Sequence, residues 1–408
     1  MKRNLLLFIL IFNIASLKAQ DSLQSPHFHF HFRNDVASNL TKPGIKNAPN
    51  NIQTLLTSPR PFSCYLGEAD LAAKFKSDDL KLWKNGTLFV QAMSTFGQAP
   101  SGNYLYDAQT FSNIEAEKHI ALYEAWYEQV IKEKLTIRVG QLDMNADFMV
   151  NDYTSGFINS SHGVLPTASA NMPLSIFPLL APGAFIKYDF NSRLEMQASV
   201  YKADPGDFTS NPYGVNWKKC FENKHSLYMY EATYKFLSKD SVYTGKASFG
   251  IGLEETDMFT WKNESFKAKD FYYLSISKLV IPSKTNNENG LGIFAVGSIA
   301  PYKKVFASKY YSFGISFNGF KRKESAVSIG FLSLSPDARF NESNINYINL
   351  GDSYENVIEF IGNYRINKYL SIQPDVQYII QPGMNKYYKN TLIGLLRVII
   401  ELQNLDKE

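Results

Sequence analysis

Three consecutive residues have side chains that could support nucleophilic catalysis. Ser160, Ser161 and His162 bring two hydroxyls and an imidazole together in the chain. Catalysis by such groups requires a hydrogen-bonded pair of nucleophile and base, and adjacency in sequence does not create that geometry. The sequence contains no phosphate-binding loop, dinucleotide fingerprint or paired-cysteine motif. We therefore do not expect an enzyme, and a serine hydrolase is kept only as an alternative.

Two further patterns resemble metal-binding sequences. Residues 27–32 read HFHFHF, which spaces three imidazoles two residues apart. A polar strand face that meets water accepts histidine without any metal, so this pattern does not require one. Asp143, Asn145 and Asp147 alternate like calcium ligands, but no glycine-and-glutamate loop of the required spacing follows. We expect neither a metal nor a cofactor.

The composition indicates that strands position these residues. The chain has 408 residues, with 30 Phe and 25 Tyr against 4 Trp, and it carries 24 Gly and 17 Pro. Aromatic residues favour strands, and glycine and proline favour turns. A 20% share of charged residues and a net charge of +4 fit neither a disordered chain nor a nucleic-acid partner. The two cysteines, Cys64 and Cys220, exclude a disulfide scaffold, and whether they pair stays open.

The N-terminal segment has the pattern of a secretory signal. Lys2 and Arg3 precede an apolar run from Leu5 to Ile14, and small residues follow up to Ala19. This run is too short to span a bilayer as a helix. We expect residues 1–20 to be a signal peptide and residues 21–408 to form one domain. That domain is then periplasmic, secreted or inserted in a membrane as a barrel.

Alternation of polar and apolar residues dominates the rest of the chain. In 370–381 the even positions are mostly apolar and the odd positions mostly polar, and 354–365 and 194–201 repeat the pattern. This period of two is typical of strands with one apolar face. About sixteen segments of membrane-strand length are predicted. They are 27–35, 62–75, 87–97, 118–131, 134–141, 183–190, 193–203, 225–237, 244–254, 269–281, 289–300, 308–320, 325–334, 353–366, 369–381 and 388–402.

The connections between these segments alternate in length. Short links such as 132–133 and 367–368 alternate with long ones such as 36–61, 142–182 and 335–352. Short turns on one rim and long loops on the other are typical of an outer-membrane barrel. The prediction is an all-β fold, a transmembrane antiparallel up-and-down β-barrel of about sixteen strands. A soluble β-sandwich also alternates and is the competing fold, although it would not sort its loops by rim.

Several segments resemble a known family. The segment 135–148 reads LTIRVGQLDMNADF, and the segment 370–378 reads LSIQPDVQY. Together with 157–161, 354–359 and 394–397, these segments resemble the carbohydrate-selective porin (OprB) family in their order and spacing. The resemblance runs from about residue 62 to 402. It implies a sixteen-stranded porin in the outer membrane of a Gram-negative bacterium, through which mono- and small oligosaccharides diffuse. A general porin without sugar preference and an outer-membrane phospholipase are the alternatives.

A sugar-preferring pore requires paired donors and acceptors together with some aromatic surface. The parity of the strands directs ten candidates inward, where guanidinium forks, amides and carboxylates can hold adjacent hydroxyls. The same residues could instead be an ordinary hydrated lining, and Trp126 could belong to the aromatic rim. The candidates are Glu124, Trp126, Glu128, Arg138, Glu359, Arg365, Gln373, Asp375, Gln377 and Arg397.

The segment 142–182 is the longest connection and contains four prolines. Its apolar tract 172–180 needs burial, so we expect it to fold into the barrel and constrict the pore. Expected partners are carbohydrate solutes, outer-membrane lipid and the barrel-assembly machinery, with a possible homotrimer and no nucleic acid.

Overall fold

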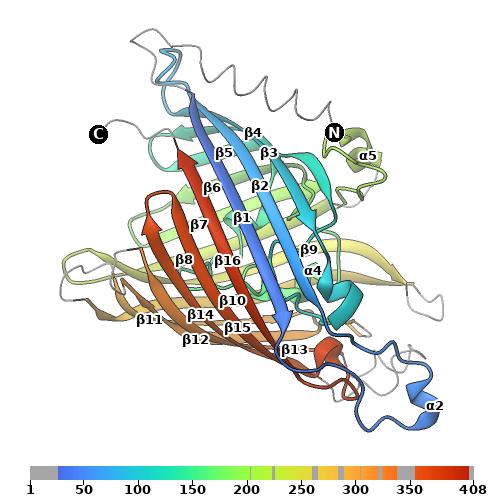
Figure 1. Ribbon diagram of the computed structural model, residues 1–408. Helices are drawn as coiled ribbons and strands as arrows, with labels where there is room; N and C mark the ends of the chain where they lie inside the picture. Colours follow the sequence, from blue (N-terminus) through green and yellow to red (C-terminus); the bar gives the residue numbers. More distant parts are fainter. Residues whose placement is uncertain are drawn as a thin grey trace, which may run out of the picture.

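The chain forms a closed barrel of sixteen antiparallel strands in the computed structural model (Figure 1). The structure describes residues 26–202, 204–222, 226–259, 265–283, 289–303, 305–319, 324–337 and 354–403. Each strand pairs with its neighbours in the sequence, and β1 closes the barrel against β16. The up-and-down barrel predicted from alternation is therefore confirmed, and a sandwich is excluded. The expected signal peptide lies outside the described residues.

All sixteen predicted segments are strands, and most boundaries agree within three residues. The strands are β1 (His27–Asn39), β2 (Ser63–Lys76), β3 (Gly86–Gly97), β4 (His119–Ile131), β5 (Leu135–Leu142), β6 (Ala181–Asp189), β7 (Leu194–Lys202), β8 (Ser226–Leu237), β9 (Tyr243–Phe259), β10 (Ser265–Pro282), β11 (Gly290–Ile299), β12 (Lys309–Asn318), β13 (Ala326–Ser335), β14 (Glu355–Asn367), β15 (Leu370–Ile380) and β16 (Thr391–Gln403).

The hairpin of β9 and β10 is longer than predicted. Ser265 pairs with Phe259 beyond the predicted limits, and the register shifts between Ala268 and Asp270. The sequence of this part of the hairpin does not alternate between polar and apolar residues, so the pattern used for prediction does not extend to it.

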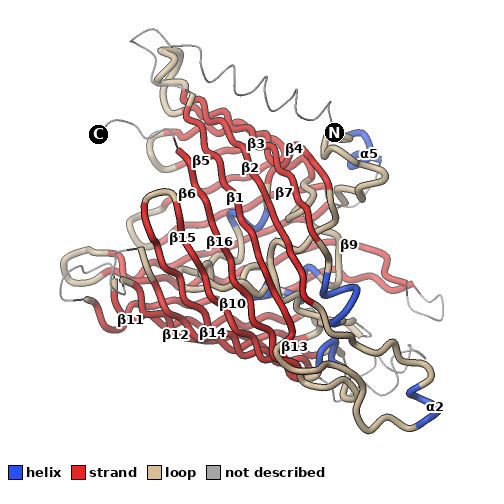
Figure 2. The backbone as a smooth tube through the Cα atoms, viewed as in Figure 1, coloured by secondary structure: helices blue, strands red, loops and turns tan. Residues whose placement is uncertain are grey.

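Short helical elements occupy the connections. They are α2 (Asn50–Gln53), η1 (Ser101–Leu105), α3 (Met144–Asp147), η2 (Ser160–His162), α4 (Pro166–Ser169), α5 (Trp217–Glu222) and η4 (Pro382–Met384). In Figure 2 these helices belong to the long-loop end of the barrel or to its interior. Among the described residues, no helix has the length and apolar character needed to cross a membrane.

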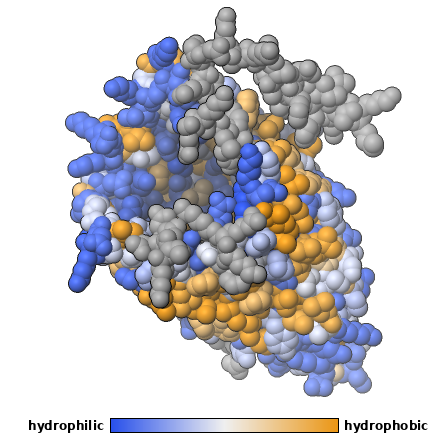
Figure 3. All heavy atoms as spheres, turned by 60° about the vertical axis from the view of Figure 1, so that its left-hand side comes forward, coloured by the Kyte–Doolittle hydropathy of each residue, from blue (hydrophilic) through white to orange (hydrophobic). Residues whose placement is uncertain are grey.

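Apolar side chains cover the outside of the barrel. Leu274, Phe313 and Phe360 are each more than half exposed, although they belong to the centres of strands. In Figure 3 hydrophobic residues gather in a broad band around the visible wall. Such a band is the surface that a barrel presents to lipid. On β1 to β3, Phe96 stacks between Phe32 and Tyr65 on this outer face, at ring-centroid distances of 6.0 and 5.9 Å.

The long β5–β6 loop, residues 143–180, folds into the barrel. Its Phe148, Phe157 and Ile158 are buried in one cluster with inner-wall residues such as Tyr310 and Leu332. Hydrogen bonds attach the same loop to the inner wall. Asn151 Nδ2 donates to Ser275 Oγ at 2.9 Å, and the Tyr310 hydroxyl donates to the Ser161 carbonyl at 2.6 Å. The loop therefore packs against much of the wall, as its apolar tract predicts.

A closed barrel of this kind is expected to resist detergent, because it has no unpaired edge. Unboiled protein should migrate differently from boiled protein on a denaturing gel. Identical mobility of the two samples, for protein recovered from membranes, would contradict the closed barrel.

Candidate functional site

A cavity of about 560 Å³ lies between the inner face of β1 to β4 and the loops that enter the barrel. The loop side comes from the β3–β4 loop (98–118) and the β5–β6 loop. The cavity is the space that the loops leave open on this side of the barrel. The polar and charged residues of its wall are His29, His31, Arg33, Glu68, Asp70, Gln91 and Tyr123, and those of the loops are Gln109, Thr110, Asn113, Glu115, Asp143, Asn145, Ser160, Ser161 and Ser169.

An ion pair crosses the wall of this cavity. Arg33 on β1 donates from Nη2 to Glu68 on β2, and the two residues are directly paired in the β1–β2 register. His31 Nδ1 lies 3.9 Å from Asp70 Oδ2, the next inward carboxylate of β2. Inward positions two residues apart thus bring two carboxylates beside one guanidinium and one imidazole.

Several polar atoms of the cavity wall are buried without a hydrogen-bond partner in the described part of the protein. Burial of a polar atom without a partner is costly unless water or a solute supplies one. Because the atoms include both donors and acceptors, they can bind a solute that carries several hydroxyls. The atoms are His29 Nε2, His31 Nε2, Arg33 Nε, Glu68 Oε2, Asp70 Oδ1, Gln109 Oε1, Asn113 Oδ1 and Glu115 Oε2.

A β-bulge in β4 adds Tyr123 to this surface. Gln91 pairs with Glu124 and Ala92 with Leu122, so the ladder passes over Tyr123. The Tyr123 hydroxyl donates to Asp143 Oδ2 at 2.6 Å, and Glu124 Oε1 accepts from the Asp143 amide at 3.2 Å. Burial raises the pKa of Asp143 to about 6, and the hydrogen bond from Tyr123 opposes that rise. The bulge therefore fixes the start of the β5–β6 loop.

Arg138 on β5 holds the same loop at Asp147, in the short helix α3. Its Nε and Nη2 donate to Glu128 Oε2 at 2.9 and 2.7 Å, and its Nη1 donates to both carboxylate oxygens of Asp147. The guanidinium lies 4.7 Å from the centroid of Trp126, which stacks on Phe89 at 4.9 Å. Trp126 is therefore inside the barrel. Because every nitrogen of this guanidinium already has a protein partner, Arg138 positions the loop.

The candidates on β15 and β16 lie beneath the loops. Arg397 is 3% exposed, and its Nε and Nη2 donate to Asp35 at 2.6 and 2.8 Å. Gln377 donates to the Phe111 carbonyl at 2.8 Å and accepts from Asn159 Nδ2 at 3.1 Å. Its neighbours on β15, Gln373 and Asp375, are also buried, and Gln377 Nε2 donates to Asp375 at 2.9 Å.

Glu359 on β14 is fully buried and accepts from the backbone amides of Ile158 and Asn159, at 2.6 and 3.3 Å. His162 Nε2 lies 3.7 Å from Glu359 Oε2, and Phe157 stacks on the imidazole at 4.1 Å. Burial lowers the pKa of His162 to about 3. Both imidazole nitrogens lack a hydrogen-bond partner in the described residues, so His162 forms no nucleophile–base pair with Ser160 or Ser161.

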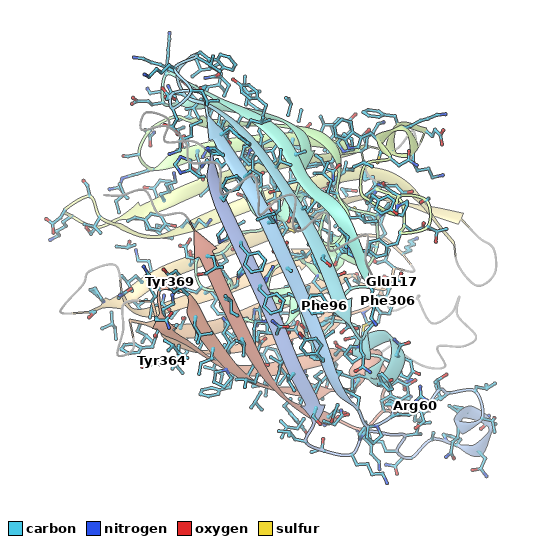
Figure 4. The ribbon with its side chains drawn as sticks, turned by 45° about the horizontal axis from the view of Figure 1, so that its top comes forward. Arg60, Phe96, Glu117, Phe306, Tyr364 and Tyr369 are labelled. Atoms are coloured by element: carbon cyan, nitrogen blue, oxygen red, sulfur yellow. The ribbon has the colours of Figure 1, made fainter. Side chains whose placement is uncertain are left out.

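Arg365 stands apart from the other candidates. It pairs with Glu401 and lies 3.3 Å from Glu324 at the short-turn rim. In Figure 4 the neighbouring Tyr364 and Tyr369 mark this end of the barrel, opposite Glu117 and Phe306.

The structure thus separates the ten predicted residues into three places. Glu124, Trp126, Glu128 and Arg138 form one cluster at the base of the β5–β6 loop, and Arg365 lies at the rim. The other five are buried beneath the loops. None of the ten lines the 560 Å³ cavity, and direct contact of any of them with a sugar stays a prediction.

Sequence reasoning missed the residues that do line the cavity. His29, His31 and Arg33 belong to the alternating pattern of β1, and Glu68 and Asp70 pair with this face from β2. Parity could have found these five. It could not have found Tyr123, because the bulge changes the parity of β4. The described residues contain no group of three or more potential metal ligands, and both cysteines are free and buried.

Comparison with known proteins assigns the family. A model of the carbohydrate-selective porin, OprB family, matches residues 64–402. The chain belongs to this family. The high-pH structure of Pseudomonas putida OprB has a TM-score of 0.75 at 16% identity, over 92% of this chain and 94% of that chain. Its low-pH structure has a TM-score of 0.55 at 12% identity, over 92% of both chains. No curated protein matches the sequence.

Rh. blastica porin is a more distant structural relative. A mutant of that porin has a TM-score of 0.51 at 8% identity, over 93% of this chain and 100% of that chain. The solved structures support the sixteen-stranded fold, and the OprB family assigns the function. This protein is a sugar-preferring outer-membrane porin, as the resemblance in its motifs implies.

Proposed function

We propose that sugars pass through the 560 Å³ cavity between β1 to β4 and the loops. The observation that supports this route most strongly is the set of buried, unpartnered donors and acceptors on its wall. A sugar ring presents hydroxyls that can both donate and accept, so it can satisfy these atoms in turn as it moves. Water can occupy them in the absence of sugar.

Five of the ten residues predicted from the sequence then act indirectly, through their contacts with the loops. Arg138 and Glu124 hold the start of the β5–β6 loop, and Arg397, Gln377 and Glu359 hold the loops against the opposite wall. These contacts determine where the loops stand and therefore how wide the cavity is. Diffusion through such a passage requires no chemical step, so we propose a channel without catalytic activity.

We also propose the setting in which the pore works. Residues 1–20 direct export, residues 21–408 form one barrel domain, and the barrel-assembly machinery inserts this domain into the outer membrane of a Gram-negative bacterium. The apolar belt supports contact with lipid. A homotrimer is proposed as the assembled form, and the mass of the detergent-extracted complex tests it.

Substitution of Asp70 tests the proposed route. Asp70→Asn keeps the shape of the side chain but replaces one acceptor oxygen by an amide donor, and the loss of a buried hydrogen bond costs about 1–3 kcal/mol. We expect the glucose concentration for half-block of the single-channel current to rise by about tenfold. Lys239→Ala, in an exposed turn, is the control. Unchanged glucose block in Asp70→Asn would place the sugar elsewhere, and glucose block absent from the unmodified protein would favour a general porin.

A further inference from the structure

A second cavity of about 620 Å³ opens at the long-loop end of the barrel. It lies between residues 169–179 of the β5–β6 loop and residues 204–209 of the β7–β8 loop. Glu117, labelled in Figure 4, stands on its rim. The two cavities share Ser169, Ile176, Phe177 and Pro178, so one segment of loop forms a wall of both. The two cavities are therefore adjacent, and we take the outer one as the mouth of the proposed route.

Carboxylates predominate along this path. Glu117, Asp204 and Asp207 line the mouth, and no lysine or arginine is among the described residues of its lining. The inner cavity adds the carboxylates Glu68, Asp70, Glu115 and Asp143 against the single guanidinium of Arg33. Arg33 already pairs with Glu68, so its charge is largely balanced. Hydrogen bonds from Ser210 lower the pKa of the exposed Asp207, which favours its ionised form.

Two of the inner carboxylates also lack partners for one oxygen. Glu68 is 2% exposed and Asp70 is 5% exposed, and their Oε2 and Oδ1 atoms have no hydrogen-bond donor among the described residues. Both residues line the inner cavity. An ammonium group supplies three donors and a positive charge, so it fits these oxygens better than a hydroxyl does.

The protonation of two loop carboxyl groups, those of Glu115 and Asp143, is sensitive to a positive charge in the cavity. Burial raises the pKa of Glu115 to about 8 and that of Asp143 to about 6. A cation beside a buried carboxyl stabilises its ionised form. A cationic solute therefore favours the ionised form of these carboxyl groups, whereas an anionic solute would be repelled by the carboxylates of the path.

We infer that this porin prefers protonated amino sugars, of the hexosamine class, to neutral hexoses, and that it disfavours sugar acids. The inference rests on the proposed route through the inner cavity. The hydroxyls of a hexosamine use the same donors and acceptors as those of glucose, and its ammonium group adds the interaction with Asp70 and Glu115. The acidic mouth raises the local concentration of the cation before it enters.

Uptake of three radiolabelled solutes into proteoliposomes tests this preference. Glucosamine, glucose and glucuronate are compared at trace concentration and pH 6.5, where the amine is protonated and the acid ionised. We expect glucosamine to enter about threefold to tenfold faster than glucose, and glucuronate to enter more slowly than glucose by a similar factor. Because salt screens charges, both ratios should shrink between 10 mM and 500 mM salt.

Two variants locate the effect. Asp70→Asn and Glu115→Gln each remove one carboxylate from the path and should lower the ratio of glucosamine to glucose uptake. Glu133→Gln removes a carboxylate from an exposed turn on the short-turn rim and should leave the ratio unchanged.

The possible outcomes separate the two proposals. Equal uptake of all three solutes, with glucose entry well above that of empty liposomes, would overturn the charge preference and leave the sugar porin intact. Glucose entry no faster than in empty liposomes would overturn the proposed function itself. A preference for glucosamine that survives both Asp70→Asn and Glu115→Gln would overturn the assignment to these carboxylates.

Discussion

Replacement of residues 144–179 by a short glycine–serine linker is expected to raise single-channel conductance about threefold or more and to remove the preference for sugars. Leu142 pairs with Ala181 in the β5–β6 register, so the ends of the loop are adjacent and a short linker can join them. The loop fills much of the interior, and a sixteen-stranded barrel without it leaves a wide aqueous channel. Planar-bilayer recordings measure the change.

The replacement also exposes apolar inner-wall residues, so folding needs a separate check. Recovery of heat-modifiable protein from the outer-membrane fraction provides it. Phe177→Ala is a milder variant, because Phe177 lines both cavities and its truncation should widen the passage between them with the loop in place. Unchanged conductance in both variants, once correctly inserted, would show that the loop does not constrict the pore.

Truncation of Arg397 to alanine is expected to destabilise the loops by about 3–5 kcal/mol. Asp35 is fully buried and Arg397 is 3% exposed, and the pair also bonds Ser112 of the β3–β4 loop. Removal of the guanidinium leaves a buried carboxylate without its counter-charge. We expect faster proteolysis of the β3–β4 loop and noisier single-channel currents, because the loop loses this attachment to the wall.

Arg365→Ala is the matched control for this prediction. Arg365 also points inward and also pairs with carboxylates, but Glu324 at its side is well exposed, so the loss should not exceed about 1 kcal/mol. Arg397→Lys keeps the charge without the bidentate geometry, so its loss of stability should lie between those of Arg397→Ala and Arg365→Ala. Equal effects of Arg397→Ala and Arg365→Ala would contradict the role of Arg397 as a loop anchor.

The fold could be predicted from the sequence because a membrane barrel imposes one simple rule on every strand. A residue of β15 such as Val376 faces lipid and its neighbour Asp375 faces the interior, and the same rule applies around the whole barrel. The alternation of short turns and long loops then predicted the up-and-down order of the strands. The rule missed the outer part of the β9–β10 hairpin, whose sequence does not alternate.

The site could not be predicted in the same way, because parity gives the face of a residue but not what covers it. Gln377 and Asp70 both point inward, yet loop residues Phe111 and Asn159 cover the first and the cavity borders the second. That difference depends on how two loops pack across the barrel, which alternation does not encode. Tyr123 could not be predicted as an inward residue for a different reason, because the β-bulge in β4 places it on the inner face against the strand's parity.

This porin prefers sugars, and we propose that they pass along the wall formed by β1 to β4. The most direct test is liposome swelling with glucose, sucrose and a neutral amino acid of similar size to glucose, using the unmodified protein beside Asp70→Asn. We expect glucose to enter faster than both other solutes, and the Asp70→Asn variant to lose most of the advantage over the amino acid. Equal rates for glucose and the amino acid in the unmodified protein would contradict the claim.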